Sequence, residues 1–239
     1  MPKFDLSKTQ QVQDLITVEL AQRDQAWIGR FYAAIVDASM ATPPDQVLTG
    51  PDGFPYFVLN IPPASQAFEP FCISHILDVC LENGFGVVVQ PGANPPAWVF
   101  PYGRLWSLKE FGKFEVEQDA QGESEKTDGT PDGTGAKTEG GNSVLVGQPS
   151  ASFFPAYARK VIQRFLAEKA GNPDPGVLLL SNPQNEPPQS LVFSIFAEDF
   201  SSPEEFERVM YLLTWFLPVH YRMTSIPKDS ELAKSFEPL

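Results

Sequence analysis

The sequence predicts an α+β fold of two similar helix–hairpin–helix–strand units, with mixed or antiparallel sheets, joined by an acidic disordered segment. Three observations predict it: apolar residues that recur at helical spacing, short apolar runs bounded by Pro- and Gly-rich turns, and a break in composition near the middle of the chain. The expected domains are an N-terminal unit at 1–114, a linker or loop at 115–142 and a C-terminal unit at 143–239.

The first unit opens with a weak helical pattern and continues with a strong one, in which an apolar residue returns every three or four positions. Pro43 ends the strong helix, because the residue before a proline is pushed out of the α-helical region. A Pro-Asp-Gly tip at 51–53 predicts a hairpin, and Gly84 ends the next helix. The expected elements are helices at 10–23 and 25–39, a hairpin of 47–48 and 54–61, a helix at 68–83, and strands at 85–90 and 97–100.

The second unit has its clearest signal where its last helix begins. Ser202 is the expected N-cap, Pro203 occupies the first turn and Glu205 completes a capping box. Leu212 and Trp215 widen the apolar stripe of this helix, which predicts a central position for it. The expected elements are a strand at 143–148, a helix at 153–170, a hairpin of 177–180 and 190–196, a helix at 203–217 and a strand at 221–226.

The two halves share the order helix, hairpin, helix, strand, although their residues are not alike. Between them, residues 115–142 hold eight acidic residues and two lysines, with only Val116, Ala120 and Ala136 as apolar side chains. Such a stretch cannot bury enough apolar surface to offset the entropy of ordering its backbone. We therefore expect residues 115–142 to lack regular structure.

The net charge of −13 argues against binding to nucleic acid or to an anionic membrane surface, since both need a surplus of Lys and Arg. The acidic segment carries −6 of that charge, so the remaining residues, at −7, are only moderately acidic. The electrostatic case for a basic partner is correspondingly weaker.

The chain has no run of the ~18 to 20 apolar residues that a membrane helix needs, and its N-terminus does not resemble a signal peptide. Its two cysteines, Cys72 and Cys80, would lie roughly 12 Å apart along one helix. A disulfide needs Cα atoms within about 7 Å, so the pair favours a reducing, cytoplasmic setting.

Motifs for nucleotide binding, metal binding and nucleophilic catalysis are missing from the sequence, so we expect no cofactor and no metal. His75, Asp78 and Glu82 share one face of the helix at 68–83, where carboxylates could do general acid–base work in a hydrolase-like enzyme. A solvated helix face has the same pattern. Cys72 could pair with His75 as a nucleophile, or it could be a small buried apolar group.

The densest aromatic run, at 98–106, contains the candidate protein-binding residues Tyr102, Arg104 and Trp106, because aromatic residues beside an arginine are typical of binding hot spots. Strand alternation would place Trp98, Phe100 and Tyr102 on one face. The alternative for these residues is packing in the core.

Two stretches resemble the SseB (enhanced serine sensitivity) family of bacterial cytoplasmic proteins. Residues 84–92, Gly-Phe-Gly-Val-Val-Val-Gln-Pro-Gly, resemble that family's strand and Asn-Pro-Gly turn, with Gln90 in place of the usual Asn. Residues 147–150 (Gly-Gln-Pro-Ser), then Phe154-Pro155 and a helix that ends in Phe165-Leu166, resemble the opening of its C-terminal domain. The acidic segment has no counterpart in the family. The resemblance implies two α+β domains, no established catalytic residues and a non-enzymatic role in protein binding.

The function expected from these observations is that of a cytoplasmic protein-binding or adaptor protein, with a toxin-neutralising protein as one form of it. The alternative is a carboxylate-dependent enzyme that uses the face of His75, Asp78 and Glu82. A protein partner is expected, and neither nucleic acid nor a membrane.

Overall fold

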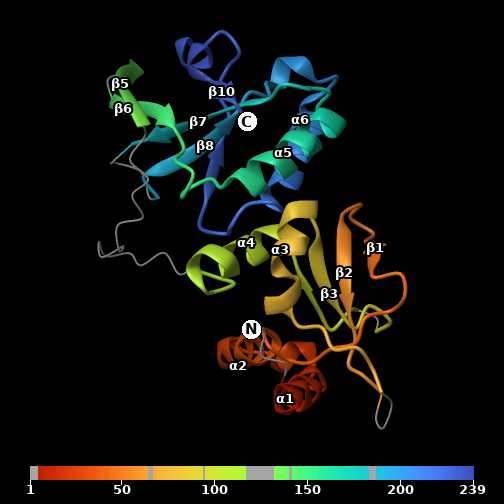
Figure 1. Ribbon diagram of the computed structural model, residues 1–239. Helices are drawn as coiled ribbons and strands as arrows, with labels where there is room; N and C mark the ends of the chain where they lie inside the picture. The colour runs from red at the N-terminus through yellow and green to blue at the C-terminus, as the bar shows by residue number, and fades with distance from the viewer. Residues whose placement is uncertain (1–4, 64–66, 94, 117–131, 140–141, 183–186) are drawn as a thin grey trace. The chain divides into compact units, whose positions relative to one another are not determined.

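The computed structural model describes residues 5–63, 67–93, 95–116, 132–139, 142–182 and 187–239. The chain divides into two compact units, which we call the first unit (Met1–Leu105) and the second unit (Trp106–Leu239). Each unit combines helices with one sheet, so the predicted α+β class is confirmed (Figure 1). The division falls inside helix α4 (Tyr102–Phe111), whereas residue 114 was the expected end of the first domain.

The first unit contains a mixed four-stranded sheet in the order β1-β2-β3-β4. Strands β1 and β2 form the expected hairpin, β2 and β3 are parallel, and β4 runs antiparallel to β3. Its elements are α1 (Leu6–Ile16), η1 (Leu20–Gln22), α2 (Gln25–Ile35), β1 (Val47–Thr49), β2 (Pro55–Leu59), α3 (Ile73–Asn83), β3 (Gly86–Val89) and β4 (Trp98–Phe100).

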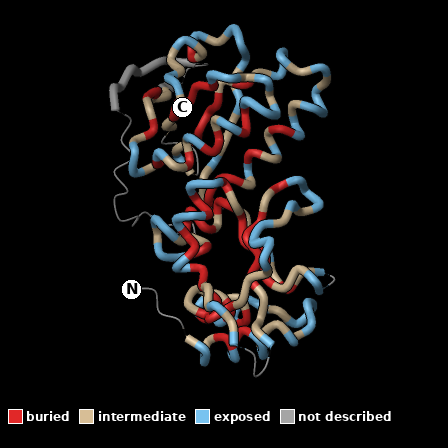
Figure 2. Tube along the Cα trace, turned by 45° about the vertical axis from the view of Figure 1, so that its right-hand side comes forward, coloured by how far each residue is buried: buried red, intermediate tan, exposed pale blue. Residues whose placement is uncertain are grey.

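The core of the first unit is rich in aromatic contacts between α2 and β4. Trp27 stacks on Phe31 at 5.0 Å, and Trp98 lies 5.4 Å from Trp27 and 5.1 Å from Phe31 between ring centroids. Gly84 follows α3 in the left-handed conformation (φ 78°), as its predicted role as a helix stop requires. Strand β3 is buried along its whole length, and Figure 2 shows buried stretches of the chain in red.

The second unit contains a sheet in the order β5-β6-β7-β8-β9, with the short strand β10 paired to β7. Strands β7 and β8 form the expected hairpin, and β8 and β9 are parallel. Its remaining elements are β5 (Asp132–Glu139), β6 (Asn142–Gln148), α5 (Ala156–Lys169), β7 (Gly176–Ser181), β8 (Gln189–Phe193), η2 (Ala197–Asp199), α6 (Pro203–Thr214), β9 (Arg222–Thr224), η3 (Glu231–Ser235) and β10 (Glu237–Pro238).

One face of this second sheet is closed by the last part of the chain. Val146, Leu178 and Val192 pack with Leu232 of η3, and Ile226 and Phe236 border the same cluster. The polar composition of residues 228–239 suggests a fraying end, but Leu232 is buried in this cluster and β10 pairs with β7. Apolar packing and strand pairing therefore hold this segment together.

The two units repeat one arrangement, as the element order predicted. In each, a helix leads into an antiparallel hairpin, and a second helix then connects the last hairpin strand to a strand parallel to it. The repeated elements are α2-β1-β2-α3-β3 in the first unit and α5-β7-β8-α6-β9 in the second.

The segment predicted at 115–142 lies mostly outside the described residues, which omit 117–131 and 140–141. Within it, Asp132–Glu139 forms strand β5, antiparallel to β6, where we expected no regular structure. Strands pair through backbone groups, which every residue carries. A strand with few apolar residues, such as β5, therefore cannot be predicted from apolar periodicity. None of the helices in the described part of the chain is long and apolar enough to cross a lipid bilayer.

Candidate interaction surface

The candidate residues Tyr102, Arg104 and Trp106 all lie on α4, not on a continuation of β4. Strand β4 ends at Phe100, and the helix begins after Pro101, so strand alternation does not extend to Tyr102. The side chains of Tyr102 and Trp106 are both 0% exposed. Both side chains therefore pack in the core, which was the alternative to a binding role. Neither offers a surface to a partner.

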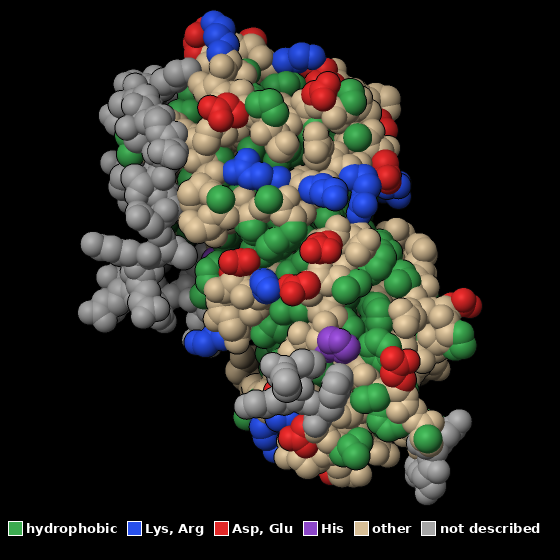
Figure 3. Space-filling model, in the orientation of Figure 1, with side chains coloured by type: hydrophobic (Ala, Val, Ile, Leu, Met, Phe, Trp, Pro, Cys, Tyr) green, Lys and Arg blue, Asp and Glu red, His purple; other side chains and the backbone are tan. Residues whose placement is uncertain are grey.

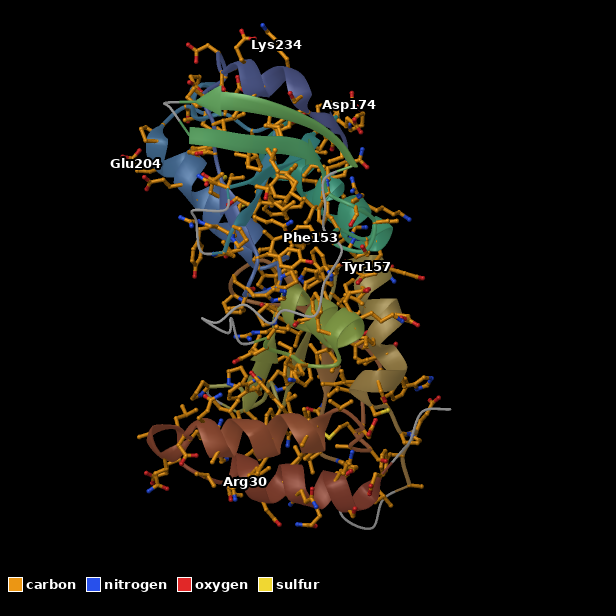
Figure 4. All side chains as sticks on the ribbon, turned by 90° about the vertical axis from the view of Figure 1, so that its left-hand side faces the viewer. Arg30, Phe153, Tyr157, Asp174, Glu204 and Lys234 are labelled. Carbon is orange, nitrogen blue, oxygen red and sulfur yellow. The ribbon has the colours of Figure 1, made fainter. Side chains whose placement is uncertain are left out.

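Tyr102 belongs to the core of the first unit, where its hydroxyl donates to the carbonyl of Leu81 at 3.0 Å. Trp106 belongs to an aromatic cluster in the second unit. Between ring centroids, Trp106 lies 5.7 Å from Phe154, 6.4 Å from Tyr157 and 5.3 Å from Tyr221. Figure 4 labels Tyr157. The indole nitrogen of Trp106 meets no hydrogen-bond acceptor among the described residues. Burial, not recognition, explains why these aromatic residues are present.

Arg104 is half-buried in the first unit. Burial lowers the pKa of its guanidinium, and the nearby Tyr32 acts in the opposite direction. Burial also raises the pKa of the Tyr32 hydroxyl, with Arg104 opposing that shift. The two groups therefore share one partly dehydrated site, and a binding role for Arg104 stays a prediction.

The proposed acid–base face of α3 is open to solvent. His75, Asp78 and Glu82 are all exposed, and the ring of His75 stacks on Phe71 at 6.2 Å. Among the residues described, no group of three or more His, Cys, Asp and Glu could hold a metal ion. Such exposure is expected of an ordinary solvated helix face, which was the alternative to an acid–base site. An open face does not exclude water from a reacting group.

The two cysteines are buried and not linked to each other. Burial raises the pKa of the Cys80 thiol to about 12, so this thiol is neutral at physiological pH. Cys72 precedes α3, with its sulfur 3.2 Å from the hydroxyl of Ser74. Ser74 donates to Asp37, which also pairs with Lys8 at 2.9 Å. These contacts tie α1 and the end of α2 to the start of α3.

The surface that the sequence did not indicate is the outer face of α6 and the turn after it. Arg208, Tyr211 and Trp215 follow one another at i, i+3 and i+7, and Val219 lies in the turn after the helix. Tyr211 is 76% exposed, Val219 is 65% exposed, Arg208 is exposed and Trp215 is half-exposed. We call these four residues the α6 outer face.

The buried side of the same helix faces the other way. Val209 and Leu213 are buried there, and Phe216 contacts Phe165 of α5 at 4.9 Å. Glu204 points away from the second unit at the start of α6 (Figure 4). The predicted apolar stripe included Trp215, because an aromatic residue within a helical pattern is usually assigned to the core. The missed signal is an arginine and two aromatic residues on the polar side of an amphipathic helix.

Charged side chains are mixed around these surfaces. Figure 3 shows Asp and Glu side chains interspersed with Lys and Arg on the drawn face. No family model matches the chain, and no curated protein or solved structure matches it significantly.

Proposed function

We propose that this protein is a non-enzymatic protein-binding or adaptor protein of SseB-like type, which meets its partner through the α6 outer face. The observation that carries the proposal is the exposure of Arg208 and Tyr211, with Trp215 partly exposed, on one side of α6 and of Val219 in the turn after it. Single exposed apolar residues are ordinary on a folded protein, but two aromatic residues and an arginine on the outer side of one helix favour an interaction site.

The composition of the α6 outer face supports a protein partner over a small molecule. Trp, Tyr and Arg are the residues most enriched among interface hot spots, because each combines a large contact area with a polar group. Arg208 is a fixed positive charge beside Tyr211. The complementary surface is an apolar patch with a carboxylate placed to meet Arg208.

The proposal places the protein in the cytoplasm and gives it a protein partner, not nucleic acid. Two buried, unlinked cysteines fit a reducing compartment. The net charge of −13 disfavours a phosphate backbone. A toxin-neutralising protein remains one form that such binding could take, since this role needs a recognition surface and no catalytic group.

A quantitative pull-down from the native host tests the proposal. The double variant Tyr211→Ala/Trp215→Ala is compared with wild type and with Leu6→Ala/Leu20→Ala, which removes two exposed apolar side chains of the first unit. We expect wild type and the control variant to retain one partner that the double variant loses at least about tenfold, as removal of hot-spot residues predicts. If the double variant retains every partner, the α6 outer face is not the binding surface.

A further inference from the structure

One strand position of the repeated arrangement is filled in the first unit, whereas no described residue of the second unit fills it. In the first unit, β4 pairs antiparallel with the outer edge of β3, with Phe100 opposite Val87 and Trp98 opposite Val89. Strand β9 is the counterpart of β3. Among the described residues, no strand pairs with the outer edge of β9.

Strand β4 covers the edge of β3 with two aromatic side chains. Trp98 and Phe100 pack against the rings of α2, at 5.1 Å and 6.2 Å from Phe31. Beneath this cover, Val87 is 0% exposed. An antiparallel strand with large apolar residues at alternate positions therefore completes the core of this arrangement.

Among the described residues, the corresponding residue of the second unit has no strand beside it and is only partly covered. Met223 pairs with Leu191, just as Val87 pairs with Phe57 in the first unit. Val192 packs with Leu232 on one face of the sheet, so Leu191 and Met223 point to the other face. Leu191 is fully buried, but Met223 is half-exposed at the edge.

The open edge is short and carries a positive charge. Pro218 and Pro227 bracket β9, and proline cannot extend a ladder of hydrogen bonds. Arg222 is exposed at the start of the strand, while Met223 and Thr224 are half-exposed. An extended segment that paired here would cover only a few residues, and an acidic residue opposite Arg222 would match its charge.

We propose that β9 accepts an extended segment of a partner protein, which pairs antiparallel with it in the place that β4 takes in the first unit. The segment carries a large apolar residue opposite Met223, an acidic residue next in sequence opposite Arg222, and a second apolar residue opposite Ser225. This site is separate from the α6 outer face and does not depend on the function proposed for it.

Amide NMR of the full-length ¹⁵N-labelled protein tests the site with a designed probe. The probe is an acetylated and amidated peptide of sequence SWTFES, in which Phe faces Met223 and Glu faces Arg222. We expect saturable shifts at Arg222, Met223, Thr224 and Ser225, and binding that weakens about two- to fivefold for the peptide SWTFKS, as one exposed ion pair predicts. Arg222→Glu should reverse this preference, whereas Lys160→Glu, an exposed charge on α5, should leave it unchanged.

Three results would overturn the proposal. The first is an absence of shifts at β9 up to millimolar peptide. The second is shifts confined to the α6 outer face, which would support the proposed function and not the strand site. The third is shifts at β9 that grow with protein concentration alone, which would identify a second copy of the chain as the occupant. Shifts at β9 together with a failed α6 pull-down would support the strand site alone.

Discussion

Acid should destabilise the second unit through His220, one of two histidines in the chain. The ring of His220 makes edge contacts with Phe111 at 4.9 Å and Tyr221 at 4.8 Å. Burial in this aromatic surrounding lowers the pKa of His220 to about 4, from an ordinary value of 6.5. We therefore lower the pH and compare wild type with the variant His220→Gln, which lacks the titrating group.

The direction of the effect follows from proton binding. Below pH 6.5 the unfolded chain takes up a proton on His220 that the folded chain does not accept until about pH 4. The contribution of neutral His220 to the free energy of unfolding is therefore fully present above pH 6.5 and is lost as the pH falls towards 4. The shift corresponds to at most about 3 kcal/mol, at ~1.4 kcal/mol per pKa unit. Because the ring is only half-buried, we expect solvent screening to reduce this to about 1.5 kcal/mol.

Urea unfolding at several pH values between 7 and 4 measures this loss in wild type, His220→Gln and the control His75→Gln. His75 is the other histidine of the chain and is exposed on α3, so its substitution is the matched control. We expect wild type and the control to lose about 1.5 kcal/mol more than His220→Gln over this range. Equal slopes in wild type and His220→Gln would refute the reasoning, since these two proteins differ in no other titratable group.

Three further predictions concern the cores of the two units. Gly86→Ala should destabilise by about 1–3 kcal/mol in urea unfolding, because a Cβ there would lie 2.7 Å from both a backbone oxygen and the Tyr56 ring; Gly92→Ala, with nothing within 4 Å, is the control. Leu232→Ala should cost about 2–4 kcal/mol in the same assay, and a change below ~0.5 kcal/mol would show that the segment does not close the sheet. Cys80 should not react with a thiol reagent at pH 8 until urea unfolds the chain, because burial raises its pKa to about 12, and rapid reaction of the folded protein would contradict this.

The sequence predicts the repeated elements well because their signals are local. The spacing of Ile73, Ile76, Leu77 and Cys80 fixes α3, and Gly84 marks its end. The cap of α6 is also confirmed, since the Ser202 hydroxyl accepts from the Glu205 amide at 3.2 Å. The Glu205 carboxylate, however, accepts from the amide of Ser201, not from that of Ser202, so the capping box is displaced by one residue.

The parts that could not be predicted depend on contacts distant in sequence. Helix α4 follows β4 after one proline, and nothing local distinguishes Tyr102 on a helix from Tyr102 on a longer strand. Strand β5 exists through backbone pairing with β6. The outer position of Trp215 depends on the orientation of α6 about its own axis. Periodicity gives the width of the apolar stripe on a helix but not which side of that stripe is covered by the rest of the unit. The aromatic candidates Tyr102 and Trp106 are therefore buried, and aromatic density alone does not indicate the exposed Tyr211 on α6.

The closure of the second sheet by Leu232 and Phe236 also bears on the order in which the units fold during synthesis. The side chain of Gln148 donates to the carbonyl of Ser235, across a sequence separation of 87 residues. The core of the second unit therefore cannot be completed until residues 232–236, which cover one face of its sheet, have left the ribosome. Every strand of the first sheet, by contrast, is available once Phe100 has emerged. Contacts this distant slow folding, so the first sheet is expected to assemble earlier in synthesis than the second.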